Sequence, residues 1–185
     1  MSYLDPGLLI APERKDWIKS HYHFDCICKT CTSPTSAESD ANRARIKTAF
    51  ERWESQPIDE WFSPDQDLIT NKLQTLNEID RVEQIIKEEC LTVFLPQLLE
   101  YKFQLHAAWG EYGEAHSVGH QWEIEEKMIG ERKGEGLEVV SRIRRNPRKW
   151  SQWGQLKKLY GLVGRARPPR QELQYGRKTS GLKRY

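Results

Sequence analysis

The apolar residues in the middle of the chain, over residues 41–130, recur at the spacing of α-helices. Ile46, Ala49, Phe50 and Trp53 fall at i, i+3, i+4 and i+7, which places them on one face of an otherwise charged helix. A second stripe of helical spacing comprises Ile69, Leu73, Leu76, Ile79, Val82, Ile86 and, at its end, Cys90. Each stripe predicts an amphipathic helix whose apolar face packs on a common core.

Residues 91–130 predict two further helices with a break near Gly110. Thr92 is a candidate cap for the first helix, and Pro96 is tolerated in its opening turn, where the missing N–H removes no helical hydrogen bond. So short a connection favours an antiparallel pair of helices. No second copy of this pair is evident in the sequence, so a long repeat array is not expected. We therefore predict a mostly α fold built of antiparallel helical hairpins.

The two ends of the chain differ from this helical middle. Within residues 1–31, "SYLDPG" predicts a strand that runs into a turn, and "APERKDWIKS" predicts a short helix with Pro12 at or near its first position. A cysteine-rich loop follows, and the polar residues 32–40 form a predicted linker. Residues 131–185 start with the hinge-like "GERKGEG" and end in a basic stretch rich in Gly and Pro, for which we expect partial disorder.

Residues 149–163 predict a basic amphipathic helix within this tail. Its lysines, Lys157 and Lys158, lie opposite an apolar side. The apolar residues are Trp150, Trp153, Leu156, Tyr160 and Val163. Such a helix can bind a membrane surface, a calmodulin-like protein or nucleic acid, or it can pack on the chain's own helices. We favour packing on the helical body, because Trp-rich faces are usually buried.

Composition and charge restrict the class of protein. The chain has 185 residues, of which 37% are hydrophobic, enough for one modest core. It has no apolar run long enough to span a membrane, and its first residues lack the basic flank and apolar segment of a secretory signal. We therefore expect a soluble protein of the nucleus or cytoplasm. Residues 142–185 contain fourteen Lys or Arg and one acidic residue, which gives this segment a net charge of +13. Because the whole chain has a net charge of +2, residues 1–141 carry −11. The basic tail is a candidate for weak nucleic-acid contact.

The stretch "HYHFDCICKTC" contains three of the four cysteines, Cys26, Cys28 and Cys31. Thiolates bind zinc tetrahedrally, and in a reducing compartment closely spaced cysteines more often hold a metal than form disulfides. The sequence therefore predicts a zinc site at these three residues. A closed structural site needs a fourth ligand, for which His21, His23 and Cys90 are the candidates within the chain. For each of them the alternative, a polar surface group or a buried core residue, is the stronger interpretation.

The segment "SYLDPGLLIAPERKDWIKSHYHFDCICKTC", residues 2–31, resembles the end of a SET domain followed by its post-SET zinc motif, as in SMYD-like and fungal SET proteins. The shared pattern is S-Y-[IL]-D, then E-R, then Y-x-F-x-C-x-C-x-x-C. Members of that family transfer a methyl group from S-adenosylmethionine to lysine side chains of proteins, histones among them. The resemblance implies that Tyr3 and Tyr22 line the lysine channel and that Phe24 stacks on the adenine of the cofactor.

The resemblance also explains the missing zinc ligand, because in the family a fourth cysteine comes from the SET core upstream. The chain is thus expected to be the C-terminal part of a SET protein that lacks the first part of the cofactor site. The family's helical region resembles tetratricopeptide hairpins, and "AAWGEYGEAHSVGHQ" is similar to the turn of such a hairpin.

Two functions are compatible with these features. The first is a SET-class protein-lysine methyltransferase that acts on a protein lysine; because it is expected to be truncated, activity of this chain alone is not expected. The second is a non-catalytic interaction protein whose helical hairpins and basic tail bind a partner peptide. A complete, preorganised site is needed for catalysis, so the two hypotheses differ in whether this chain binds S-adenosylmethionine by itself.

Overall fold

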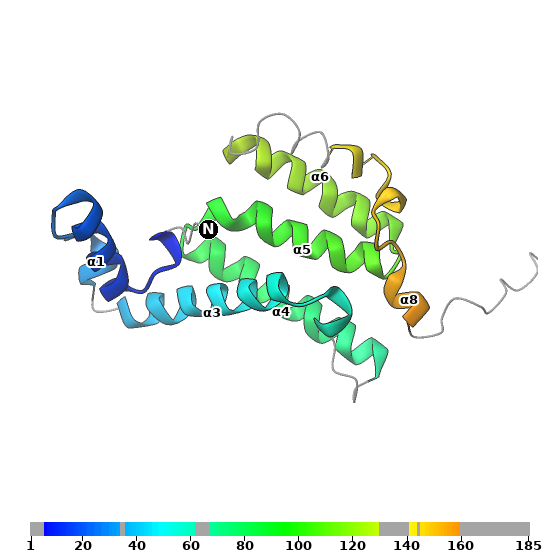
Figure 1. The fold of residues 1–185 in the computed structure, drawn as a ribbon, viewed down its shortest axis with the longest axis horizontal. Helices are drawn as coiled ribbons and strands as arrows, with labels where there is room; N and C mark the ends of the chain where they lie inside the picture. The colour runs from blue at the N-terminus through cyan, green and yellow to red at the C-terminus, as the bar shows by residue number, and fades with distance from the viewer. Residues whose placement is uncertain (1–5, 34–35, 62–66, 130–140, 144, 160–185) are drawn as a thin grey trace, which may run out of the picture.

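The computed structural model describes residues 6–33, 36–61, 67–129, 141–143 and 145–159 (Figure 1). Most of these residues are helical and none of them forms a strand, so the predicted mostly α class is confirmed for the described part of the chain. The strand predicted within "SYLDPG" falls on residues 2–5, outside the described residues. None of the described helices combines the length and the apolar character that a membrane crossing requires.

The N-terminal segment consists of η1 (Pro6–Leu8), α1 (Ala11–Tyr22) and the short α2 (Lys29–Thr32). Pro12 lies in the first turn of α1, as predicted. The helix ends at His23, whose φ of 59° is left-handed and whose N–H donates to the Lys19 carbonyl at 3.0 Å. The first N–H of α1, that of Ala11, donates to Asp40 Oδ1 at 2.8 Å. This bond ties the N-terminal segment to the following helix.

The helical body begins with α3 (Ser36–Ser55), η2 (Ile58–Trp61) and α4 (Leu68–Glu88). α3 starts within the predicted linker, because Ser39 and Asp40 find tertiary partners as parts of a helix. Ser39 Oγ donates to Glu89 Oε2 at 2.5 Å, and further along Arg52 pairs with Glu78 at 2.5 Å. The start of α3 thus lies against the end of α4, which makes the two helices antiparallel.

The second half of the body contains η3 (Thr92–Phe94), α5 (Leu95–Ala108) and α6 (Tyr112–Ile129). Thr92 opens η3 instead of capping α5, and Pro96 lies in the first turn of α5 as predicted. α5 and α6 lie side by side as an antiparallel hairpin (Figure 1). Gly110 connects them with a φ of 67°, which confirms the predicted break.

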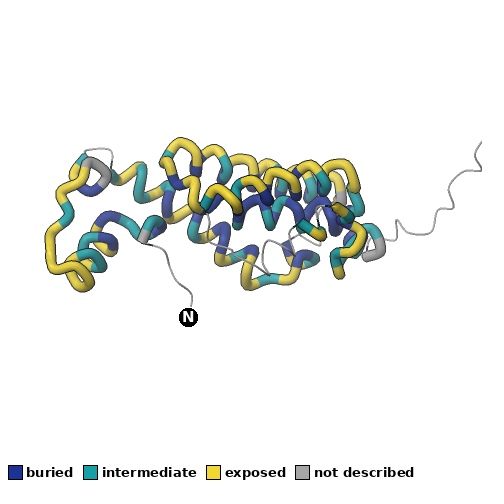
Figure 2. The backbone as a smooth tube through the Cα atoms, turned by 90° about the horizontal axis from the view of Figure 1, so that it is seen from above, coloured by how far each residue is buried: buried dark blue, intermediate teal, exposed yellow. Residues whose placement is uncertain are grey.

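Residues of α5 contribute to two hydrophobic clusters. Leu98, Tyr101 and Leu105 belong to the cluster with α3 and α4, whereas Leu99 and Phe103 belong to the cluster with α6. A helix that is apolar on several sides has to be buried. Figure 2 shows the buried backbone running through the interior of the body, with exposed residues on the outer helical faces. The predicted resemblance of this body to tetratricopeptide hairpins stays a prediction.

The basic segment after α6 packs on this body. Its described elements are η4 (Pro147–Lys149) and α8 (Gln155–Leu159). Trp150 and Trp153 pack against the α5–α6 cluster, Leu156 is fully buried in the main core, and the Gly154 N–H donates to the Ala107 carbonyl at 2.9 Å. Packing on the helical body, the favoured prediction, is thereby confirmed. Of the helix predicted over residues 149–163, only Gln155–Leu159 is α-helical in the described part. Residues 151–154 form a turn that ends at Gly154, whose φ is 68°, and residues 160–163 lie outside the described part.

Candidate metal centre

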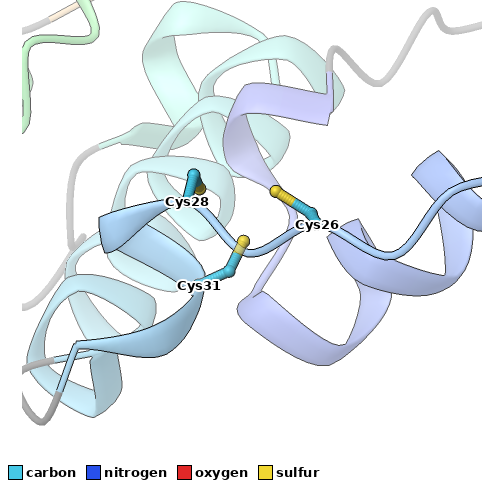
Figure 3. A group of neighbouring side chains, drawn as sticks. All are labelled: Cys26, Cys28 and Cys31. Atoms are coloured by element: carbon cyan, nitrogen blue, oxygen red, sulfur yellow. The ribbon is translucent and has the colours of Figure 1, made fainter.

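Three cysteines come together where the N-terminal segment turns back toward α3. The sulfurs of Cys26, Cys28 and Cys31 all lie within 4.8 Å of one another. Figure 3 shows the side chains of Cys26 and Cys31 directed toward each other, with Cys28 beside them at the start of α2. None of the four cysteines, all of which lie in the described part of the chain, forms a disulfide. The prediction that the spacing gathers these three residues into one cluster is confirmed.

The local backbone explains this convergence. The Cys28 carbonyl accepts hydrogen bonds from the N–H of Cys31 at 3.0 Å and from the N–H of Thr32 at 3.1 Å. It also accepts one from Thr32 Oγ1 at 3.0 Å. These bonds close a single helical turn, which brings the residues at i and i+3 to the same side. Cys26 precedes the turn in non-helical chain and reaches the same point from the other direction.

The thiols influence one another. A hydrogen bond from the Cys28 backbone favours the thiolate of Cys26. Thiol hydrogen bonds with Cys28 and Cys31, together with partial burial, outweigh that bond and raise the pKa of Cys26 above its ordinary value. A metal ion has to displace protons from such a site, so its affinity rises with pH.

The donor set fits zinc. Zn–S bonds of about 2.3 Å in a tetrahedron place the sulfurs about 3.8 Å apart. The observed limit of 4.8 Å is compatible with closure around an ion after small side-chain shifts. Three thiolates with one further donor form a familiar structural zinc site. Cys26, Cys28 and Cys31 are thus the residues that would hold the metal.

None of the three candidates for the fourth ligand joins the cluster in the described part of the chain. His21 stacks on Trp17 with ring centroids 4.3 Å apart, and its Nδ1 lies 2.8 Å from the Trp17 carbonyl oxygen. His23 is exposed at the left-handed end of α1. Cys90 is exposed after α4 with a φ of 55°, so its predicted place in the second apolar stripe is wrong.

The residues that the structure leaves undescribed include neither Cys nor His. The remaining donors for a fourth position are therefore water, a carboxylate or a group from another polypeptide chain.

The predicted substrate and cofactor aromatics form an exposed group beside the cysteines. Tyr22 is 62% exposed and Phe24 is 54% exposed, and their ring centroids lie 6.5 Å apart. Trp17 contacts Tyr22 edge-on at 5.7 Å between centroids. Ile27, between two of the cysteines, is also exposed. Tyr3 lies outside the described residues, so its predicted proximity to Tyr22 stays a prediction.

Arg14 of α1 is a residue of this site to which the sequence analysis gave no role. Its side chain is buried, and its Nε donates to Cys31 Sγ at 3.3 Å. A signal for it was present in the sequence: Arg14 lies three residues after Ala11 and four before Ile18, on the apolar side of α1. A charged residue in such a position needs a buried partner. The partner here is a cysteine of the cluster.

Neither a family model nor a curated protein nor a solved structure matches this chain. Assignment of the site therefore rests on its own residues and on their geometry.

Proposed function

We propose that the chain binds one zinc ion through Cys26, Cys28 and Cys31. The observation that carries this proposal is the convergence of the three sulfurs within 4.8 Å of one another. The segment that bears them is short and contributes few residues to the main core, and a metal supplies the stabilisation that such a segment lacks. Zinc would act structurally here, holding the loop before α2 in place.

We further propose that this zinc site belongs to a SET-class protein-lysine methyltransferase. Support comes from the order of residues in "YHFDCICKTC" and from the exposed Tyr22 and Phe24 next to the cysteines. Exposed rings in one place mark a surface that another molecule covers. In such an enzyme a neutral lysine amine attacks the methyl carbon of S-adenosylmethionine. The C–S bond breaks with its electron pair on sulfur, and the methylated amine loses a proton to solvent.

In this assignment aromatic rings around the amine tolerate the positive charge that passes from sulfur to nitrogen. Tyr22, with Tyr3, would line that channel, and Phe24 would stack on the cofactor's adenine. A nuclear or cytoplasmic site of action belongs to the same proposal.

The test is metal analysis of the purified full chain before and after mild chelation, with Cys28→Ser and Cys90→Ser as a matched pair. We expect at most one zinc per chain, held so that a chelator removes it readily, because one coordination position lacks a cysteine or histidine of this chain. Cys28→Ser is expected to abolish binding, whereas Cys90→Ser is expected to leave it unchanged. Equal zinc contents for the two variants before chelation would refute the assignment of the ligands.

A second candidate function, non-catalytic binding of a partner peptide, is supported by α6. This helix exposes Ile124 and Met128, one helical turn apart, on its outer face. Calorimetric titration with S-adenosylmethionine separates the two functions. Little saturable binding is expected for this chain by itself, which favours the interaction role. A dissociation constant in the low micromolar range would favour the enzyme.

A further inference from the structure

Arg14 is held at two points inside the N-terminal segment. Its Nε donates to Cys31 Sγ at 3.3 Å, and its Nη1 donates to the Leu9 carbonyl at 2.7 Å. The residue is only 8% exposed. The two bonds use different edges of the planar guanidinium, so they fix both its position and its orientation. The Cys31 sulfur is accordingly held in place by a group from another helix.

The charge of Arg14 lacks a carboxylate in the described surroundings. The carboxylate of Glu89 pairs with the nearby Arg43, whose Nη2 lies 3.7 Å from it. Asp40 accepts the first N–H of α1. Burial, and after it the charge of Arg14, lowers the pKa of Arg43, which indicates that the two guanidinium groups repel each other. Arg14 Nη2 is buried without a hydrogen-bond partner among the described residues.

A buried, unpaired arginine is costly unless a negative charge lies beside it. The cysteine cluster can supply that charge. Three thiolates around a divalent ion, with a neutral fourth ligand, carry a net charge of −1. This value matches the single positive charge of Arg14, which already contacts one of the three sulfurs.

We propose that Arg14 is a positioning residue of the metal centre, which orients the Cys31 sulfur and neutralises the net charge of the zinc trithiolate group. This inference rests on the proposed function and adds a residue and a role to it. Outer-sphere partners that donate to a ligand orient it and strengthen the metal site, and their loss typically costs about 10- to 100-fold in metal affinity. A hydrogen bond from the charged guanidinium to a thiolate ligand likewise stabilises the thiolate and strengthens the metal site.

The experiment uses the full chain and two substitutions of Arg14. Zinc affinity is measured by competition with a chelator, and cobalt(II) is used as a spectroscopic probe of thiolate ligation. Arg14→Met keeps an unbranched apolar stem and removes the guanidinium with its charge, and we expect a loss of about 10-fold or more in zinc affinity. Arg14→Lys keeps the charge but cannot reach both Cys31 and Leu9, so an intermediate affinity is expected. The thiolate-to-cobalt absorption band should be weakened in the same order.

Arg43→Met is the control for burial and for charge, because Arg43 is about as buried as Arg14 and acts on Cys31 through its charge. Its side chain donates hydrogen bonds to Ser39 and the Gly7 carbonyl. This variant is expected to unfold at lower urea concentration but to bind zinc within about threefold of the unaltered chain. Circular dichroism establishes that each variant is folded before titration, and Arg14→Lys keeps the comparison usable if Arg14→Met does not fold.

Equal zinc affinity in the unaltered chain and a folded Arg14 variant would overturn the inference while leaving the proposed zinc site intact. An equal loss in Arg43→Met would also overturn it, since a buried charge near Cys31 would then account for the effect without the hydrogen bond from Arg14. Failure of the unaltered chain to bind zinc or cobalt would overturn the proposed function itself, and this inference with it.

Discussion

Gly110 connects α5 to α6 with a φ of 67°, and its replacement by alanine tests how the hairpin is held. In the left-handed region a Cβ costs about 1–2 kcal/mol. Space is not the obstacle. A Cβ at this position would lie 3.6 Å from Lys157 Cδ and Nζ and 3.7 Å from Gly154 Cα, which are ordinary contact distances. The cost of Gly110→Ala is therefore conformational.

The unfolded chain offsets part of that cost. Alanine restricts the unfolded backbone more than glycine does, which returns about 0.4–1 kcal/mol. The net effect expected for Gly110→Ala is a loss of about 1 kcal/mol in the free energy of unfolding. For a protein of this size such a loss lowers Tm by about 2–4 °C. Gly110→Asn should lose less, because asparagine tolerates the left-handed conformation better than alanine.

Gly113 provides a matched control three residues away. It lies in the first turn of α6, and a Cβ there would meet nothing within 4 Å. Gly113→Ala is therefore expected to stabilise the protein by about 0.5 kcal/mol through helix propensity. Urea unfolding followed by circular dichroism measures both variants. A Gly110→Ala protein as stable as the unaltered chain, or a Gly113→Ala protein less stable than it, would refute the conformational account of the hairpin turn.

Two further predictions concern the rest of the helical body. Burial would raise the pKa of Glu111, but hydrogen bonds from Lys72 and His106 outweigh it and hold that pKa below its ordinary value. The associated stability is present above the unfolded pKa of about 4.3 and is lost as pH falls through the lower folded pKa. Urea midpoints measured across that pH range should fall less on acidification for Lys72→Met than for the unaltered chain. An equal fall in the two proteins would exclude the Lys72–Glu111 pair as the source of the acid sensitivity. Leu156→Ala should cost about 2–5 kcal/mol because Leu156 is fully buried, and a loss below about 0.5 kcal/mol would mean that α8 is not docked.

Much of the helical body follows from apolar periodicity alone. The predicted stripe Ile46, Ala49, Phe50 and Trp53 is buried in full. The second stripe is buried only in its later half: Ile79 and Ile86 are inaccessible, whereas Ile69 and Leu73 are 71% and 54% exposed. Periodicity identifies which face of a helix is apolar. It does not say how far along the helix a neighbour covers that face, because the packing partners of α4 come from distant sequence.

The same limit applies to helix ends. Ser39 and Asp40 lie in the predicted linker 32–40, and residues of their types usually cap a helix instead of lying inside it. Within α3 they bond instead to Glu89 and to the Ala11 N–H, partners 50 and 29 residues away. Likewise, the docking of Trp150 and Trp153 could be predicted from their apolar character, but the left-handed Gly154 that interrupts the expected helix allows its N–H to reach the Ala107 carbonyl.

The candidate metal centre likewise has a part that follows from local sequence and a part that depends on tertiary packing. Cys26, Cys28 and Cys31 are close in sequence, so one turn of backbone suffices to gather them and their spacing predicts the cluster. Arg14 lies 17 residues before Cys31 and reaches it only because α1 folds back over α2. Ligand spacing specifies where a metal binds, whereas tertiary packing specifies the charge that surrounds it. The affinity of this site is thus a property of the packed N-terminal segment, and a peptide of residues 21–31 should bind zinc more weakly than the full chain.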